Sequence, residues 1–315
     1  MRRSIYLGTL TFFGIVMMAT GFEARQERSS LVVHSLSDNL YMLANATGVE
    51  GIGSGGNTAI FVTDGGVTLV DTKIQGYGQD ILAAVRTLTD KPVTTIINTH
   101  THWDHSGSNT EFPDTVQFVA HENTRRNMAS EDCDDGAGFQ GGSIKNCQAF
   151  KGANARYLPQ TTYSDTLTLF SGVDQIDLYY FGRGHTDGDT FVVFREARTM
   201  HTGDMFARPG LPFVDVPNSN GSAVEFGETL KKAIAGISGV DTVIPGHNPV
   251  PLAWSDFVNY SGFYNDLVMQ TQAGKAAGRT VDEVVSSYRV PSQFSGNAAP
   301  PDRVRATVQY LFDGQ

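Results

Sequence analysis

The chain has 315 residues, of which 40% are hydrophobic, and a formal net charge of −10. This length and composition are typical of an ordinary globular protein that buries a sizeable core in one large domain or two small ones. The acidic balance argues against nucleic-acid phosphates and anionic membrane surfaces as partners.

The first 24 residues have the layout of a secretory signal peptide. Positive charge at residues 1–3 precedes an apolar run over 5–18, and small residues follow up to Ala24. The run is shorter than the roughly 20 residues that a transmembrane helix needs, although an uncleaved membrane anchor is the alternative. We therefore expect residues 25–315 to form a periplasmic or secreted protein without a stable membrane partner.

The first half of the mature chain contains a series of expected strands. Short apolar or alternating runs are separated by turn signals such as residues 64–66, and residues 79–88 carry apolar side chains at helical spacing. The glycine-rich segment 51–57 lacks the ending of a phosphate-binding loop, and we interpret it as a mobile loop over the functional site. The expected strands are 31–34, 40–43, 58–62, 67–71, 94–99 and 116–120, followed by a short helix over 122–129.

The two cysteines, Cys133 and Cys147, lie in a segment over 131–152 that is rich in Gly, Asp, Asn and Ser. This composition indicates a loop. In an exported protein the pair indicates a disulfide that closes the loop, with two unpaired thiols as the alternative. Two sulfurs without a histidine in the loop do not suit a zinc site.

The second half repeats the mixture of strands and helices. We expect strands over 166–170, 175–181, 190–194, 199–201 and 242–244, and helices over 223–237 and most of 255–310. No linker separates independent domains. A two-layer sheet core flanked by helices is the simplest architecture that buries these elements together.

The sequence His-Thr-His-Trp-Asp-His at residues 100–105 places four potential metal ligands within six positions. An apolar run leads into it, so the cluster lies where a strand ends. His100 and His102 are two residues apart, which in an extended segment points both side chains to the same side. Asp104 and His105 follow as the chain turns and can face a second position. The density of ligands predicts a metal site, with a solvated polar turn as the alternative.

Three later segments each place a histidine or an aspartate just after an expected strand. Loops at strand ends commonly carry functional groups, and glycines there allow the backbone to turn sharply. A lone histidine in such a loop is more often structural, so each segment gains its meaning only together with residues 100–105. The three segments are Gly184-His185-Thr186-Asp187-Gly188-Asp189, Thr202-Gly203-Asp204 and Pro245-Gly246-His247-Asn248-Pro249.

The remaining histidines carry weaker signals. His121 and His201 lie in or at the end of expected strands, where a packed role and a role in orienting a metal ligand both fit. His34 lies in the first expected strand.

These motifs, in this order, resemble those of the metallo-β-lactamase superfamily over nearly the whole mature length. The resemblance implies an α+β fold, a four-layer αββα sandwich with a two-metal site at one edge, here with a helical C-terminal extension. It implies that Asp204 bridges two metals. The other implied ligands are His100, His102 and His185 for the first metal and Asp104, His105 and His247 for the second.

Imidazole and carboxylate ligands without thiolate suit zinc, here two ions per chain, with iron or manganese as competitors. Two such cations lower the pKa of a shared water to near neutrality, and the bridging hydroxide can attack an acyl carbonyl. We expect Asp104 to be catalytic, because it can orient the nucleophile or pass a proton to the leaving group. The chain contains no Gly-x-Ser-x-Gly motif that would indicate a competing serine nucleophile.

Position 204 discriminates between branches of the family. β-Lactamases generally carry Cys or Ser there, whereas Asp204 is similar to the glyoxalase II and lactonase branches. Ala207 stands where homoserine lactonases often have tyrosine. Residues 211–218 are expected to line the pocket opposite the 51–57 segment.

Within that loop we expect Phe213 and Asn218 to contact the substrate, although a core position for Phe213 is the alternative. The sequence thus predicts an exported dinuclear zinc hydrolase that cleaves an ester, lactone, thioester or amide bond of a small-molecule acyl substrate. A periplasmic β-lactamase, a mononuclear iron persulfide dioxygenase and a binding protein without activity are the alternatives.

Overall fold

The computed structural model describes residues 30–49, 51–133 and 144–315. The expected signal segment 1–24 and the middle of the cysteine loop lie outside these residues. Among the residues that are described, no helix combines the length and apolar character needed to span a membrane.

The first half of the chain forms a seven-stranded sheet whose strands follow one another in chain order. The strands β1 to β4 are antiparallel, and β4 to β7 are parallel. Parallel neighbours need a crossover connection, which α1 (Gly78–Leu88) provides between β4 and β5. The strands are β1 (Leu31–Ser35), β2 (Leu40–Asn45), β3 (Thr58–Thr63), β4 (Gly66–Val70), β5 (Val93–Ile97), β6 (Gln117–His121) and β7 (Thr161–Tyr163), with α3 (Glu122–Met128) after β6.

The second half forms a six-stranded sheet in the order β13-β12-β11-β10-β9-β8. Its one parallel pair, β11 with β12, is connected through α5 (Ala223–Gly236). The strands are β8 (Thr166–Leu169), β9 (Ile176–Tyr179), β10 (Phe191–Phe194), β11 (Thr199–His201), β12 (Thr242–Ile244) and β13 (Leu252–Ala253).

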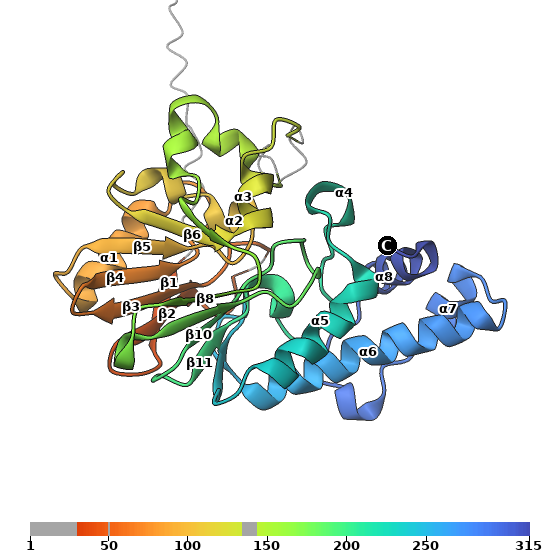
Figure 1. Ribbon diagram of the computed structural model, residues 1–315. Helices are drawn as coiled ribbons and strands as arrows, with labels where there is room; N and C mark the ends of the chain where they lie inside the picture. The colour runs from red at the N-terminus through yellow and green to blue at the C-terminus, as the bar shows by residue number, and fades with distance from the viewer. Residues whose placement is uncertain (1–29, 50, 134–143) are drawn as a thin grey trace, which may run out of the picture.

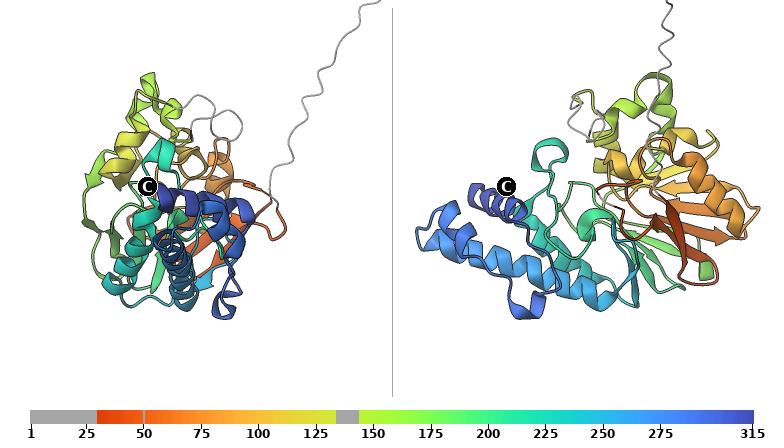
Figure 2. Two further views of the ribbon diagram at one scale, coloured as in Figure 1. Left: turned by 90° about the vertical axis from the view of Figure 1, so that its right-hand side faces the viewer. Right: turned by 180° about the vertical axis from the view of Figure 1, so that it is seen from behind.

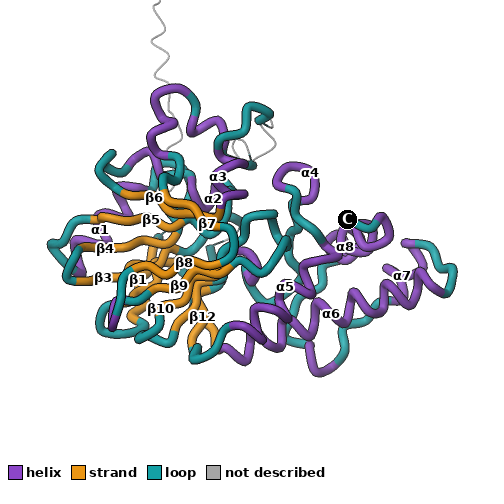
Figure 3. Tube along the Cα trace, viewed as in Figure 1, coloured by secondary structure: helices purple, strands orange, loops and turns teal. Residues whose placement is uncertain are grey.

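Alternate side chains of each strand enter different apolar layers, as a period of two requires. In β10, Val192 and Phe194 point between the two sheets, where Phe194 lies 5.1 Å from Phe61 between ring centroids. Phe191 of the same strand packs on the helices of the second half. On the outer face of the first sheet, Ile81 of α1 covers the strands. Three apolar layers therefore hold four structural layers, which confirms the αββα sandwich (Figures 1 and 3).

The C-terminal extension consists of α6 (Trp254–Ala276), α7 (Val281–Ser287) and α8 (Pro301–Asp313). The helices α6 and α8 pack on α5, and α7 packs on α8 and α6, all on the side of the second sheet that faces away from the first (Figures 1 and 2). Tyr264 of α6 is fully buried, and its hydroxyl donates a hydrogen bond to the Ala223 carbonyl at 2.8 Å. The extension is thus part of the same core as the second sheet.

The structure confirms the expected strands and long helices to within one or two residues at most ends. The sequence patterns predict the three-residue strands β11 and β12 but miss several other short elements, because so few residues carry little periodic signal. Among the missed elements are α2 (Trp103–Ser106), α4 (Val216–Ser219), β7, β13 and the 3₁₀ helices over Cys147–Phe150 and Gly152–Tyr157. The expected disulfide between Cys133 and Cys147 is present, with the two Cα atoms 5.9 Å apart.

Candidate metal centre

The side chains singled out in the sequence meet at one edge of the sandwich. After β5 ends at Ile97, the chain runs through residues 98–102 and then makes the single helical turn α2. Asn98 and Asn109 exchange side-chain hydrogen bonds across this turn, with the shorter one at 2.8 Å. His100 and His102 precede this turn, whereas Asp104 and His105 lie within it, in agreement with the expected change of direction after His102.

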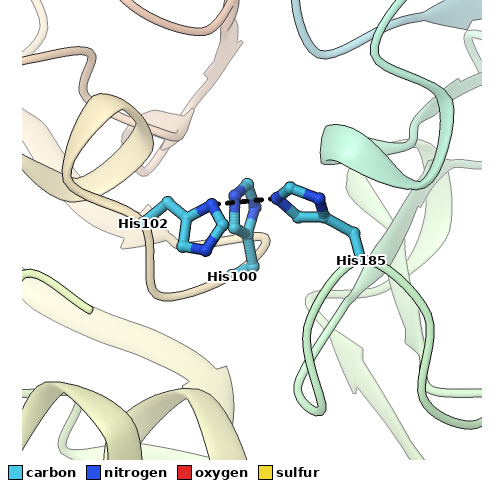
Figure 4. A group of neighbouring side chains, drawn as sticks. All are labelled: His100, His102 and His185. Carbon is cyan, nitrogen blue, oxygen red and sulfur yellow. Dashed lines mark hydrogen bonds between the residues drawn. The ribbon is translucent and has the colours of Figure 1, made fainter. Parts of the chain in front are cut away.

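His100, His102 and His185 form the first group, and their ligand atoms lie within 4.8 Å of one another. His102 Nδ1 is 2.9 Å from His185 Nε2. Figure 4 shows the three rings turned toward one another, two from the loop that leads into α2 and one from the facing loop. All three are buried. The first group therefore joins the two halves of the chain.

Asp104, His105 and His247 form the second group, also with ligand atoms within 4.8 Å. His247 Nε2 lies 3.2 Å from Asp104 Oδ2 and 3.1 Å from His105 Nε2. Asp204 stands between the groups, since its Oδ2 is 3.3 Å from His247 Nε2 and 3.6 Å from His185 Nε2. All seven residues expected as ligands thus come together in one place.

Four of the five histidines in these groups form a hydrogen bond to the protein through one ring nitrogen, which leaves the other nitrogen facing the centre. Such partners fix the tautomer and the direction of a metal-binding ring. The pairs are His102 Nε2 with Asp215 Oδ2 at 2.9 Å, His105 Nδ1 with Asp71 Oδ2 at 2.7 Å, His185 Nδ1 with the Phe213 carbonyl at 2.7 Å, and His100 Nδ1 with Thr99 Oγ1 at 3.0 Å.

Asp71 supports both groups at once. One of its oxygens accepts hydrogen bonds from His105 Nδ1 and from Thr99 Oγ1, and the other accepts from the Thr99 backbone N–H at 2.8 Å. Because the Thr99 hydroxyl donates to Asp71, it accepts from His100. A single buried carboxylate therefore orients one histidine of each group.

Sequence reasoning missed both supporting aspartates. Asp71 is the last residue of an expected strand, and the predicted ligands also lie near strand ends. Its position could therefore have indicated a role at the site. Asp215 has no such signal, because it lies in the loop expected to contact substrate and reaches His102 across 113 positions in the sequence.

The donor set suits a divalent metal such as zinc. The Nε2 atom of His100 is buried and has no hydrogen-bond partner among the described residues, and a metal ion would satisfy it. Burial lowers the pKa of His185 to about 4, and burial together with His105 holds the pKa of His100 well below its usual range. Both rings are therefore neutral near pH 7, the form in which imidazole binds metals.

The carboxylates of the centre are ionised. Burial opposes the charged form of Asp104, but the neighbouring His105 and His247 bring its pKa down to about 2. The same two histidines outweigh burial at Asp204 and hold its pKa well below the usual range. Two carboxylates and several imidazoles converging away from water form a site that could hold metal.

The glycine-rich segment after residue 50 contacts the His247 loop. The Asn57 side-chain amide donates to the carbonyls of Pro245 and Asn248, at 2.8 and 2.7 Å, and its own carbonyl lies 3.2 Å from His201 Nε2. Residues 54–57 are buried, so the expectation of a mobile loop does not hold for this part. His201 supports a ligand loop without joining either group.

The other two histidines lie away from the ligand groups. His121 caps α3 and stacks on Tyr180, with ring centroids 3.9 Å apart. His34 lies in β1, and its Nε2 is buried without a hydrogen-bond partner among the described residues.

A cavity of about 440 Å³ opens over both groups. Gly51 and Ile52 form part of one wall and Phe213 part of another, as the sequence predicts. Asn218 lies in α4, where its backbone and side chain both donate to Asp215. It is not among the described residues that line the cavity, and its contact with substrate stays a prediction.

Comparisons with known proteins give one family and one fold. The family model described as the metallo-beta-lactamase superfamily matches residues 51–249, whereas no curated protein matches the sequence. The structure is similar to a metallo-beta-lactamase from Pontibacter korlensis, with a TM-score of 0.58 and 17% identity over 75% of this chain and 99% of that one. It is also similar to the DIM-1 metallo-beta-lactamase, with a TM-score of 0.55 and 15% identity over 75% of this chain and 97% of that one. At such identities the likeness shows the fold alone.

Proposed function

Because the chain belongs to the metallo-beta-lactamase superfamily, whose members are mostly metal-dependent hydrolases, we propose that it is an exported dinuclear zinc hydrolase. Its substrate is a small molecule with an ester, lactone, thioester or amide bond. One observation carries the proposal: two groups of metal-ligand atoms, each within 4.8 Å, lie on either side of Asp204 beneath a cavity.

Each residue has a task in this proposal. His100, His102 and His185 would hold one zinc ion and Asp104, His105 and His247 the other, and Asp204, which lies between the two groups, would be available to both. When bound, the two ions supply an activated water and polarise the acyl carbonyl. Asp104 also lines the cavity, where it can accept the proton of the attacking water and return it to the leaving group.

Export is supported by two features. The N-terminal sequence has the charge and apolar run of a signal peptide. The disulfide between Cys133 and Cys147 fits an oxidising compartment.

The test combines metal content with turnover. We expect about two zinc ions per chain after zinc-replete expression, measured by elemental analysis, and EDTA-sensitive hydrolysis of at least one member of a panel of lactones, thioesters and aryl esters. Less than one metal ion per chain, or no turnover across the panel, would contradict the proposal.

β-Lactam hydrolysis is the second candidate, because the β-lactamase structures named above match over nearly their whole length. Asp204 argues against it. Nitrocefin turnover well above that of an EDTA-treated sample would favour this activity, whereas none across a penam, a cephem and a carbapenem would dismiss it.

A further inference from the structure

The cavity over the metal centre has one wall that the family match does not cover. Family similarity ends at residue 249, but Tyr260 of α6 and Arg303 of α8 also line the cavity. Ile52, Trp103, Leu211 and Phe213 add apolar side chains to the lining of the same cavity. The C-terminal extension therefore completes the pocket, and its side chains can select the substrate.

Two arginines in this cavity have no carboxylate partner. Arg208 is exposed and Arg303 is half-buried, and neither takes part in an ion pair or hydrogen bond among the described residues. Five other arginines do pair with carboxylates: Arg126, Arg183, Arg195, Arg198 and Arg305. Apart from Asp104 and Asp204, which belong to the candidate metal centre, Arg208 and Arg303 are the Asp, Glu, Lys and Arg side chains among the described residues that line this cavity. Two unpaired guanidinium groups there would attract an anion.

Arg303 is held in place by an aromatic contact. Its guanidinium carbon lies 5.1 Å from the centroid of the Phe213 ring, within the range of a cation–π interaction. Phe213 in turn lies 6.0 Å from the His185 ring. The Phe213 ring would therefore lie between His185 and a substrate carboxylate bound at Arg303.

We propose that Arg208 and Arg303 form an anion-binding subsite, so that the substrate is an acyl compound with a carboxylate on an apolar body. This inference rests on the proposed hydrolase function. Guanidinium groups recognise carboxylates through charge-assisted, often bidentate hydrogen bonds. The apolar wall takes the body of the substrate, and the acyl carbonyl lies over the ligand groups.

A matched pair of esters tests the subsite. Mono-4-nitrophenyl adipate carries a free carboxylate, and methyl 4-nitrophenyl adipate is its neutral counterpart. The wild type should prefer the acid in kcat/KM, and Arg208→Gln and Arg303→Gln should each reduce that preference about tenfold through KM. Arg305→Gln is the control, because Arg305 lies on the same helix but pairs with Asp282 at 2.7 Å. It should keep the full preference.

Two results overturn the subsite: equal use of both esters by the wild type, or a preference that survives in the double variant. If neither ester is cleaved, the hydrolase proposal is in question and binding decides the subsite. Isothermal titration with monomethyl adipate should then show at least tenfold weaker binding by the double variant. Equal binding or no binding by the two proteins overturns the inference.

A second inference comes from a different observation. Tyr260 is fully buried and lines the cavity, and its hydroxyl has no hydrogen-bond partner among the described residues. Its ring packs on Phe206, with centroids 4.6 Å apart. Burial, with contributions from Tyr264 and Asp204, raises the pKa of Tyr260 well above its usual range, so the hydroxyl keeps its proton. Leaving such a group unpaired is costly, unless a ligand satisfies it.

We infer that the Tyr260 hydroxyl donates a hydrogen bond to the substrate oxygen on which negative charge develops. Tyr260→Phe should lower kcat about a hundredfold with little change in KM, and the melting temperature should stay the same or rise. Tyr264→Phe is the matched control one turn further along α6. It loses the bond to Ala223, so its melting temperature should fall while kcat stays unchanged.

An unchanged kcat in Tyr260→Phe overturns this role. If no ester is cleaved, the affinity for pentylphosphonate, whose tetrahedral anion resembles the transition state, provides the test. Tyr260→Phe should then bind about tenfold more weakly than the wild type and Tyr264→Phe equally well. Equal affinity of Tyr260→Phe and wild type, or no binding by either, overturns the inference.

Discussion

Replacing His102 by alanine is expected to lower kcat/KM at least about a thousandfold and to reduce bound zinc from about two ions per chain to about one. His102 contributes one of three imidazoles to the first group, and its Nδ1 lies 2.9 Å from His185 Nε2. Loss of the ring leaves His100, His185 and the shared Asp204, one ligand fewer than the resemblance assigns to this metal, so the zinc ion should be held much less tightly. Elemental analysis and initial rates on the best ester of the panel measure both effects.

The same substitution also leaves Asp215 without its buried partner. His102 outweighs the effect of burial and holds the pKa of Asp215 far below its usual range, so the variant should also be less stable. Removing one member of a buried pair typically costs about 3–5 kcal/mol. His34→Ala serves as the control, because His34 lies in β1 away from both groups. Full zinc content and more than a tenth of the activity in His102→Ala would contradict the assignment.

The second large effect is expected from Asp71→Asn. This substitution keeps the shape of the side chain but can replace a hydrogen-bond acceptor of His105 by a donor. Asp71 accepts from His105 Nδ1 and from the Thr99 hydroxyl on the same oxygen. An amide nitrogen at that position would donate, so His105 would carry its proton on Nε2, the atom that faces the centre. We expect metal affinity to fall about 10- to 100-fold, as for other partners of metal-binding histidines.

Competition with a chelator measures the zinc affinity and so tests the predicted loss of affinity independently of catalysis. The variant should recover part of its activity at high zinc, whereas His102→Ala should not. Asp241→Asn is the control, because Asp241 is exposed and pairs with Arg198 at the surface. An unchanged zinc affinity in Asp71→Asn would show that the carboxylate does not set the tautomer of His105.

The secondary structure followed from the sequence wherever a period was long enough to measure. The strand starting at Thr58 and the helix starting at Ala223 begin where their patterns predict. The one-turn helix α2 was not predicted, although it carries Asp104 and His105 of the second group. Its four residues are too few to show an apolar repeat.

The ligand set could be predicted because its residues are chemically unusual at strand ends, and their order in the chain resembles a known family. The orientation of these side chains could not be predicted from the sequence. Asp215 reaches His102, and Asn57 reaches the His247 loop, across more than a hundred positions, and such contacts leave no local pattern. The same holds for Arg303 and Tyr260, which the sequence indicates only as members of a helical extension.

The sequence by itself determined which residues can bind metal, since that depends on the side-chain chemistry of residues such as His100 and Asp204. Only the tertiary structure decided which ring nitrogens face the centre and which residues wall the cavity. The physical reason is that both depend on packing between the two sheets and the C-terminal helices. That packing brings Asp71, Asp215 and Arg303 to the edge of the sandwich where β5, β11 and β12 end.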